Sequence, residues 1–91
     1  MKPEIILQEL EGLAERMGLE ILQEKGNFKG GACIVEGREV IVLNRSKPIE
    51  QRIRTLAIEL SGRDLAGHYL KPVLRDTLEE LGSGTGPTQA A

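Results

Sequence analysis

The chain has 91 residues, which is enough for one small domain, and its hydrophobic fraction of 40% predicts that it folds. Its 12 basic and 14 acidic residues give a net charge of −2, and its only aromatic residues are Phe28 and Tyr69. This balance argues against a general nucleic-acid-binding module, which carries a basic excess and stacking aromatics.

Cysteine use and hydropathy indicate where the protein works. A single cysteine rules out an internal disulfide and indicates a reducing, cytoplasmic setting. The sequence has no signal peptide and no apolar run long enough to cross a bilayer, so we expect no membrane contact. Arginine outnumbers lysine and glutamate far outnumbers aspartate, which is typical of a thermophilic source.

The first helix is predicted from Pro3 to Met17, because apolar residues recur at helical spacing along one side of it. They are Ile6, Leu10, Leu13 and Met17. Leu19 to Lys25 predicts a strand with one buried face. The glycine-rich segment Gly26 to Gly31 is expected to be a connecting loop, with a phosphate cradle as the alternative.

A hairpin is predicted next. Ala32 to Val35 forms one strand, Glu36 and Gly37 form a tight turn, and Arg38 to Asn44 returns as the next strand. The returning strand contains the unbroken aliphatic run Val40 to Leu43, which favours the centre of a small sheet.

A second amphipathic helix is expected from Pro48 to Ser61, with Ser46 as its N-cap and Gly62 as its stop. Its buried stripe comprises Ile49, Ile53, Leu56 and Leu60. Ile58 points nearly opposite that stripe, beside Thr55, Ser61 and Gly62. We interpret Thr55, Ile58 and Gly62 as an interface with another segment or subunit, the alternative being simple exposure to solvent.

The end of the chain is predicted to hold an irregular segment from Leu65 to Leu70 and a last helix from Pro72 to Leu81. Residues 1–82 thus form a single α+β domain and 83–91 a disordered C-terminal tail. The order α-β-β-β-α-α favours a two-layer fold in which helices cover one face of a small antiparallel three-stranded sheet. A domain of this size gains stability from dimerisation if the other sheet face is open.

The segment Glu39 to Leu60 resembles the strand, turn and active helix of the ImmA/IrrE-type zincin metallopeptidases. In that family the strand ends in asparagine, as here at Asn44, and the helix carries Thr-Leu/Ile-Ala-His-Glu-Leu-Gly-His. The corresponding residues here are Thr55, Leu56, Ala57, Ile58, Glu59, Leu60, Ser61 and Gly62. Glu59 falls at the position of the family's general base, whereas Ile58 and Gly62 replace its two zinc histidines. The resemblance implies a zincin-like scaffold without its metal, because isoleucine and glycine bind no zinc.

Glu59 and Cys33 are the first candidate reactive side chains. Glu59 as a general base needs a metal or another electrophile nearby, and the alternative is a surface ion pair with Arg63 one helical turn away. Cys33 lies between Ala32 and Ile34 in a predicted strand, so it is expected to be a small buried residue.

Two further groups of polar residues are candidate sites. His68 and Tyr69 lie in the irregular segment, where an exposed histidine and a tyrosine packed over the core edge are expected. Arg45, Ser46 and Lys47 precede a helix, where free N–H groups attract anions, although turn and capping chemistry explains the same residues.

The sequence therefore favours a small bacterial protein that is not an enzyme, holds no metal or cofactor, and acts by self-association or by binding another protein. One alternative is a metal-dependent hydrolase using Glu59, with His68, Cys33 or Asp64. Another is an anion- or nucleotide-binding module using Lys29, Arg45 and Lys47.

Overall fold

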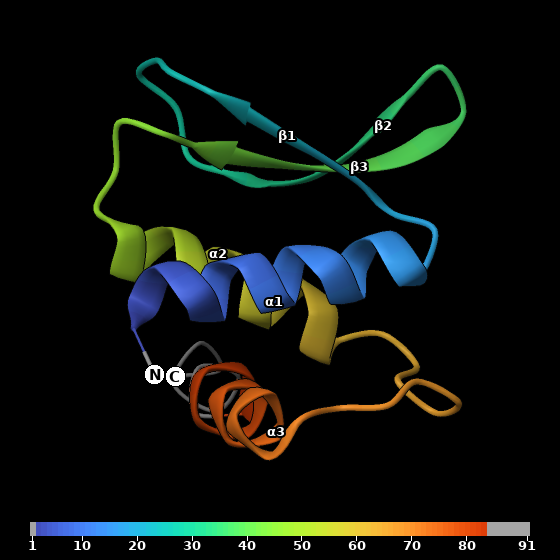
Figure 1. Cartoon of the computed structure of the whole chain (residues 1–91). Helices are drawn as coiled ribbons and strands as arrows, with labels where there is room; N and C mark the ends of the chain where they lie inside the picture. The colour runs from blue at the N-terminus through green and yellow to red at the C-terminus, as the bar shows by residue number, and fades with distance from the viewer. Residues whose placement is uncertain (1, 84–91) are drawn as a thin grey trace.

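The computed structural model, which describes residues 2–83, has strand β3 (Arg38–Asn44) at the centre of a three-stranded sheet (Figure 1). Strand β1 (Glu20–Glu24) lies on one side of β3, and strand β2 (Gly31–Val35) lies on the other. The aliphatic run of β3 requires this position, because Ile41 and Leu43 are fully buried and Val40 is only 2% exposed. The predicted central strand is confirmed.

The sheet is mixed, so the predicted antiparallel arrangement is wrong for one of its two pairings. β2 pairs with β3 in antiparallel fashion, as the hairpin prediction required. β1 pairs with β3 in parallel, with Ile21 opposite Ile41, and it does not pair with β2. The reason is the length of the connection between β1 and β2. It is long enough to pass over the end of β3, so that β3 can lie between β1 and β2.

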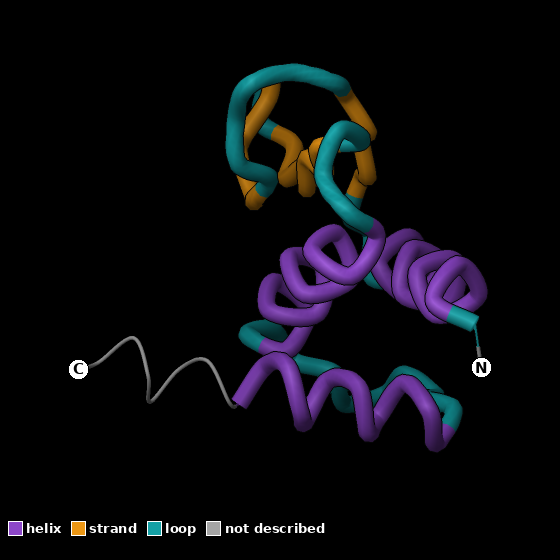
Figure 2. The backbone as a smooth tube through the Cα atoms, turned by 90° about the vertical axis from the view of Figure 1, so that its left-hand side faces the viewer, coloured by secondary structure: helices purple, strands orange, loops and turns teal. Residues whose placement is uncertain are grey.

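The helices lie on one side of the sheet, which confirms the α+β class. α1 (Pro3–Arg16) and α2 (Ile49–Ser61) lie side by side against the sheet (Figure 2). α3 (Pro72–Leu78) continues into a π-helical turn, η1 (Glu79–Ser83), and these pack on the far side of α1 and α2 (Figures 1 and 2). The third helix therefore supports the helix pair and does not cover the sheet.

The core lies between the sheet and the two long helices and continues down to α3. The buried apolar residues that form it are Leu7, Leu10, Leu13, Ala14, Leu19, Ile41, Leu43, Ile53, Leu56, Ala57, Leu60, Leu74 and Leu78. Most of the helical members belong to the predicted stripes, whose members Ile6, Met17 and Ile49 are only half-buried. Leu7 is buried although it was not part of the predicted stripe. Leucine supplies most of this core because the chain has almost no aromatic residues.

The two faces of the sheet differ. Residues directly opposite each other in neighbouring strands project to the same face, and successive residues alternate between faces. Ile21 and Ile41 belong to the core, so they define the inner face. Leu22, Cys33, Val40 and Val42 then lie on the outer face, where Leu22 and Cys33 are exposed, Val42 is half-buried and Val40 is buried.

Asn44, the last residue of β3, ties the loop between β1 and β2 to the turn before α2. Its side chain is 2% exposed, and its Nδ2 donates to the carbonyl oxygens of Gly26 at 2.8 Å and Phe28 at 2.6 Å. Its Oδ1 accepts from the backbone N–H of Ser46 at 2.9 Å. All three contacts lie at the end of β3 over which the β1–β2 loop passes. The side-chain amide of Asn44 therefore fixes this loop at the end of the strand.

Gly30 lets the same loop approach β3 closely. A Cβ at this position would lie 2.5 Å from the backbone oxygen of Val42 and 3.4 Å from the methyl group of Thr55. Only glycine fits, so this residue serves close backbone packing. The alternative of a phosphate cradle gains no support, because the segment leads into β2 and not into a helix.

Two predicted helix boundaries differ from the structure by more than one residue. Pro48 and not Ser46 occupies the N-cap of α2, because Asn44 already holds the Ser46 N–H in a turn. The last α-helix ends at Leu78, three residues before Leu81, and continues as η1 to Ser83. The predicted tail lies outside the described residues from residue 84 onward.

Replacement of Asn44 by alanine should destabilise the fold. The change leaves the Gly26 and Phe28 carbonyls and the Ser46 N–H without their present partner, at an expected cost of about 2–4 kcal/mol in unfolding free energy. Denaturant unfolding measures it. Asn27→Ala in the same loop, at an exposed residue, is the control and should change stability by less than about 0.5 kcal/mol. Equal effects of the two substitutions would contradict the role given to Asn44.

Candidate functional site

Glu59 lies in an ion-pair cluster at the end of α2. Arg63 Nη1 donates to Glu39 Oε2 at 2.6 Å, and its Nη2 lies 4.0 Å from Glu59 Oε1. The predicted pair of Glu59 with Arg63 is confirmed, and Glu39 joins it from β3. The guanidinium therefore links the helix end to the central strand.

No three histidine, cysteine, aspartate or glutamate side chains gather at one place within residues 2–83. Ile58, on α2, and Gly62, at its C-cap, lie one helical turn apart, on either side of Glu59 in the sequence. Their side chains supply no ligand atoms.

The predicted interface residues lie on the outward side of α2. Thr55 and Ile58 are half-buried, and Gly62 is exposed at the C-cap. The start of β2 lies directly above them, since the Thr55 methyl group approaches Gly30. α2 contacts β2 and β3, whereas α1 contacts β1, so this side of the helix layer faces the β2 edge of the sheet.

Strand β2 is an edge strand with an unusual composition. Its residues are Gly31, Ala32, Cys33, Ile34 and Val35, without a charge or a proline. Four of the five are exposed, and Ile34 is 67% exposed. Edge strands normally carry charges, prolines or bulges that prevent pairing with another chain, and β2 has none of these.

β2 and α2 together form one surface, which we call the β2–α2 surface. Ala32 and Ile34 project to the inner side of the sheet, because they pair with Ile41 and Glu39. They nevertheless stay exposed, and α2, which carries Thr55 and Ile58, is the long helix that contacts this strand. Ala32, Ile34, Thr55, Ile58 and Gly62 define this surface.

Three predictions about single side chains are wrong, those for Cys33, His68 and Tyr69. Cys33 is exposed and not buried, because it projects from an edge strand to the outer face of the sheet. Tyr69 is 74% exposed and does not pack over the core. His68, which was expected to be exposed, is half-buried in the segment between α2 and α3. The topology therefore keeps His68 and Cys33 in different regions.

The backbone N–H groups of Arg45, Ser46 and Lys47, the candidate anion site, are hydrogen-bonded within the protein. The Arg45 N–H donates to Glu24 at 2.9 Å, and the Lys47 N–H donates to Asn44 at 3.0 Å. The Ser46 N–H is held by the Asn44 side chain. The space beside Lys47 measures about 10 Å³, which admits at most one water molecule. These contacts favour turn chemistry for Arg45, Ser46 and Lys47.

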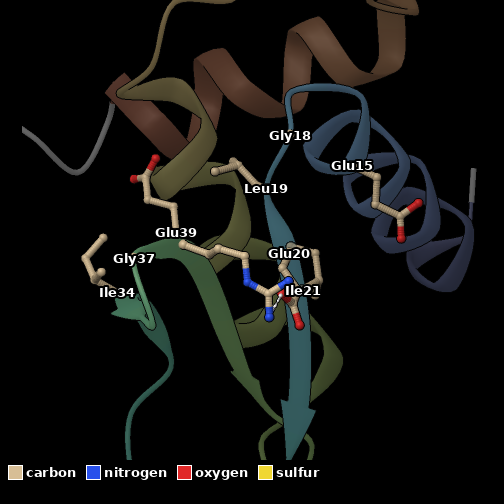
Figure 3. A pocket seen from close by; sticks show the side chains of 9 residues that line it. Glu15, Gly18, Leu19, Glu20, Ile21, Ile34, Gly37 and Glu39 are labelled. Atoms are coloured by element: carbon tan, nitrogen blue, oxygen red, sulfur yellow. Dashed lines mark ion pairs between the residues drawn. The ribbon is translucent and has the colours of Figure 1, made fainter.

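A larger hollow lies at the opposite end of the sheet, between the start of β1 and the turn joining β2 to β3 (Figure 3). It has a volume of about 750 Å³, and both charged side chains, such as Glu15 and Glu39, and apolar ones, such as Leu19, line it. Glu20 pairs with Arg38 at 3.6 Å across it, and both side chains are largely exposed. Exposed ion pairs of this kind are solvated and contribute little to stability. The pair therefore does not hold the polar groups of the hollow in a fixed arrangement.

An apolar groove of about 690 Å³ lies between the starts of the two long helices and η1. Pro3, Ile6, Ile53 and Leu81 line it, with Glu50 and Arg54 at its rim. None of the described helices is long and apolar enough to span a bilayer.

Comparison with protein families, with curated proteins and with solved structures gives no match for this chain. The site is therefore interpreted from its own geometry.

Glu11, on α1, is a half-buried carboxyl that the sequence analysis missed. Burial raises the pKa of Glu11, the nearby charge of Glu15 raises it further, and Arg52 opposes them. Gln23 Nε2 donates to Glu11 Oε2 at 2.6 Å, which joins α1 to β1. Its position on the polar flank of a helical stripe gave no signal in the sequence.

Replacement of Glu11 by glutamine should stabilise the protein at neutral pH. A raised pKa means that the folded state binds more protons than the unfolded state between the ordinary and the raised pKa, so stability falls as pH rises through that window. Glutamine does not ionise, so it removes this loss of stability, and its amide oxygen can still accept the hydrogen bond from Gln23. The gain should disappear below the ordinary glutamate pKa of about 4.3. Thermal unfolding across pH measures it, with the exposed Glu36→Gln as control; a gain that persists in acid would contradict the assignment.

Proposed function

We propose that this chain is a small non-catalytic module that binds protein, either a second copy or another chain, through the β2–α2 surface. The observation that carries the proposal is the uncharged, exposed edge strand β2 beside the half-buried Ile58. An exposed edge presents backbone N–H and C=O groups to an incoming strand, and its side chains supply specificity. The proposal retains the reducing, cytoplasmic setting expected from the single cysteine.

The other edge of the same sheet supports this choice by contrast. β1 begins and ends with glutamate, at Glu20 and Glu24, and Lys25 follows it. Charges of this kind discourage strand addition. The β1 edge is thus protected by charges and the β2 edge is not. If the sheet simply lacked protection at its edges, both edges would be uncharged, so the contrast favours β2 as a binding strand.

The resemblance to zincins is part of the proposal, as a scaffold that retained its central strand and helix. β3 ends in Asn44 and leads through a turn to α2, where Glu59 occupies the position of the family's base. In this chain Asn44 fixes a loop and Glu59 pairs with Arg63, so both have structural uses without metal.

Purified protein dialysed against a chelator and then against buffer should retain no stoichiometric zinc, because Ile58 and Gly62 supply no ligands. Elemental analysis measures it. A double variant, Ile58→His with Gly62→His, is the control and should take up more zinc than the parent. Stoichiometric zinc in the parent would overturn the non-catalytic proposal.

A peptide of alternating valine and threonine, flanked by lysines, should bind the edge of β2, because such a sequence forms strands readily. Amide NMR of the labelled protein should show shifts confined to Gly31–Val35 and the outward side of α2. The same peptide with a central proline is the control, since proline removes a ladder donor.

Variants on the β2–α2 surface should weaken this binding. Ile34→Lys adds a charge to the edge, and Ile58→Asp adds one to the adjoining helix. Leu22→Glu lies on the outer sheet face near the other edge and should leave the peptide shifts unchanged. Shifts that appear at β1, or none at all, would refute binding through β2.

A further inference from the structure

We infer that the partner of the β2–α2 surface is a second copy of this chain. The β2 strands of two copies pair antiparallel about a two-fold axis at Cys33, joining two three-stranded sheets into one. This inference rests on the proposed function and specifies its partner. A two-fold interface requires a surface that is complementary to itself, and β2 meets that requirement in hydrogen bonding, charge and shape.

The hydrogen-bonding groups of β2 point in the required direction. The turn between β2 and β3 has two residues, Glu36 with φ of 51° and Gly37 with φ of 78°, which is a type I′ geometry. Val35 and Arg38 therefore close the hairpin as a hydrogen-bonded pair, and Cys33 bonds to β3 in the same way two residues on. The N–H and C=O groups of Ala32 and Ile34 then point away from β3, toward the open edge.

These free groups match those of a second copy. With Cys33 on the axis, Ala32 of one copy lies opposite Ile34 of the other. Each such pair exchanges both of its backbone hydrogen bonds, and the two-fold axis repeats the exchange. The pairing uses all the outward donors and acceptors of Ala32 and Ile34 and disturbs none of the bonds to β3.

Charge favours this pairing at β2 and opposes it at β1. β2 has no charged residue, so two copies place no like charges opposite each other. The ends of the paired strands bring Lys29 of one copy toward Glu36 of the other. Antiparallel β1 strands centred on Leu22 would instead place Glu20 opposite Glu24 at both ends, and like charges in opposed positions are destabilising.

The helices contribute a second contact. Because α2 lies beneath β2 and β3, pairing of the β2 strands brings the outward sides of both α2 helices toward the axis. Thr55 and Ile58 of one copy then face those of the other, and the small Gly62 permits close approach. Five-residue strands alone bury less than the roughly 800 Å² per partner of a stable interface, so a reversible, concentration-dependent dimer is expected.

Cys33 provides a reporter for this register. Its own backbone groups bond to β3, so across the new edge it forms a non-hydrogen-bonded pair with a Cα separation of about 4.5 Å. Disulfides span Cα separations of about 4.4–6.8 Å. Mild oxidation of the concentrated protein should therefore link two copies through Cys33, and Cys33→Ser should abolish the link while leaving the equilibrium mass unchanged.

The decisive experiment measures the mass of the full chain by sedimentation over a wide concentration range under reducing conditions. Wild type should shift from monomer to dimer. Ala32→Pro should remain a folded monomer, because it removes an outward N–H and no bond to β3. Leu22→Glu should dimerise like wild type, since it lies on the outer face and not on the β2 edge.

A charge-complementation pair makes the test independent of proline. One variant carries Ala32→Lys with Ile34→Lys and the other carries Ala32→Glu with Ile34→Glu, both at exposed residues. Each should be monomeric alone, because like charges oppose each other across the axis, and an equimolar mixture should form a mixed dimer.

Three results would overturn the inference. They are a wild-type monomer at every concentration, a dimer that Ala32→Pro leaves intact, and a failure of the charged variants to associate when wild type does. A monomer that still binds the valine–threonine peptide at β2 would refute the second copy and leave the proposed protein-binding function standing. A monomer that binds no strand at β2 would refute both.

Discussion

The hydrogen bonds of Asn44 hold together the part of the fold on which everything else depends. β3 lies between two strands that are consecutive in the chain, so their connection must pass across its end. A loop in that position has backbone carbonyls facing the protein, and buried carbonyls need donors. The Asn44 amide supplies them for Gly26 and Phe28, while its oxygen orders the turn that starts α2. The order of the strands and the position of α2 thus both depend on the side chain of Asn44.

That sheet order determines which surfaces remain open. With β3 in the centre, β1 and β2 both become edges, and the helix layer covers only the inner face. β1 carries glutamates at both ends, whereas β2 carries only small and apolar residues. The binding surface we propose follows from this asymmetry together with α2, which lies beneath β2 and turns Ile58 toward the same side.

Local patterns in the sequence predicted the elements well. The helical stripes, the β2–β3 hairpin and the central position of Val40–Leu43 all depend on neighbouring residues, and the structure confirms them. The parallel pairing of β1 could not be predicted, because a glycine-rich connection serves either a simple hairpin or a passage over another strand. The exposure of Cys33 depends in turn on that pairing. The clustering of Arg63 with Glu39 and Glu59 joins residues far apart in the chain, and only the Glu59 half followed from helical spacing.

The parallel pairing of β1 also sets the order in which contacts become possible as the chain folds. β2 and β3 are joined by a two-residue turn, so their ladder forms from near neighbours and closes only a short loop. β1 reaches the sheet only through pairs such as Glu20 with Val40, which close a much longer loop. Non-local pairing of this kind is what slows folding. The hairpin that carries the open edge can therefore exist before β1 arrives, and the nascent chain exposes its pairing strand before the sheet is complete.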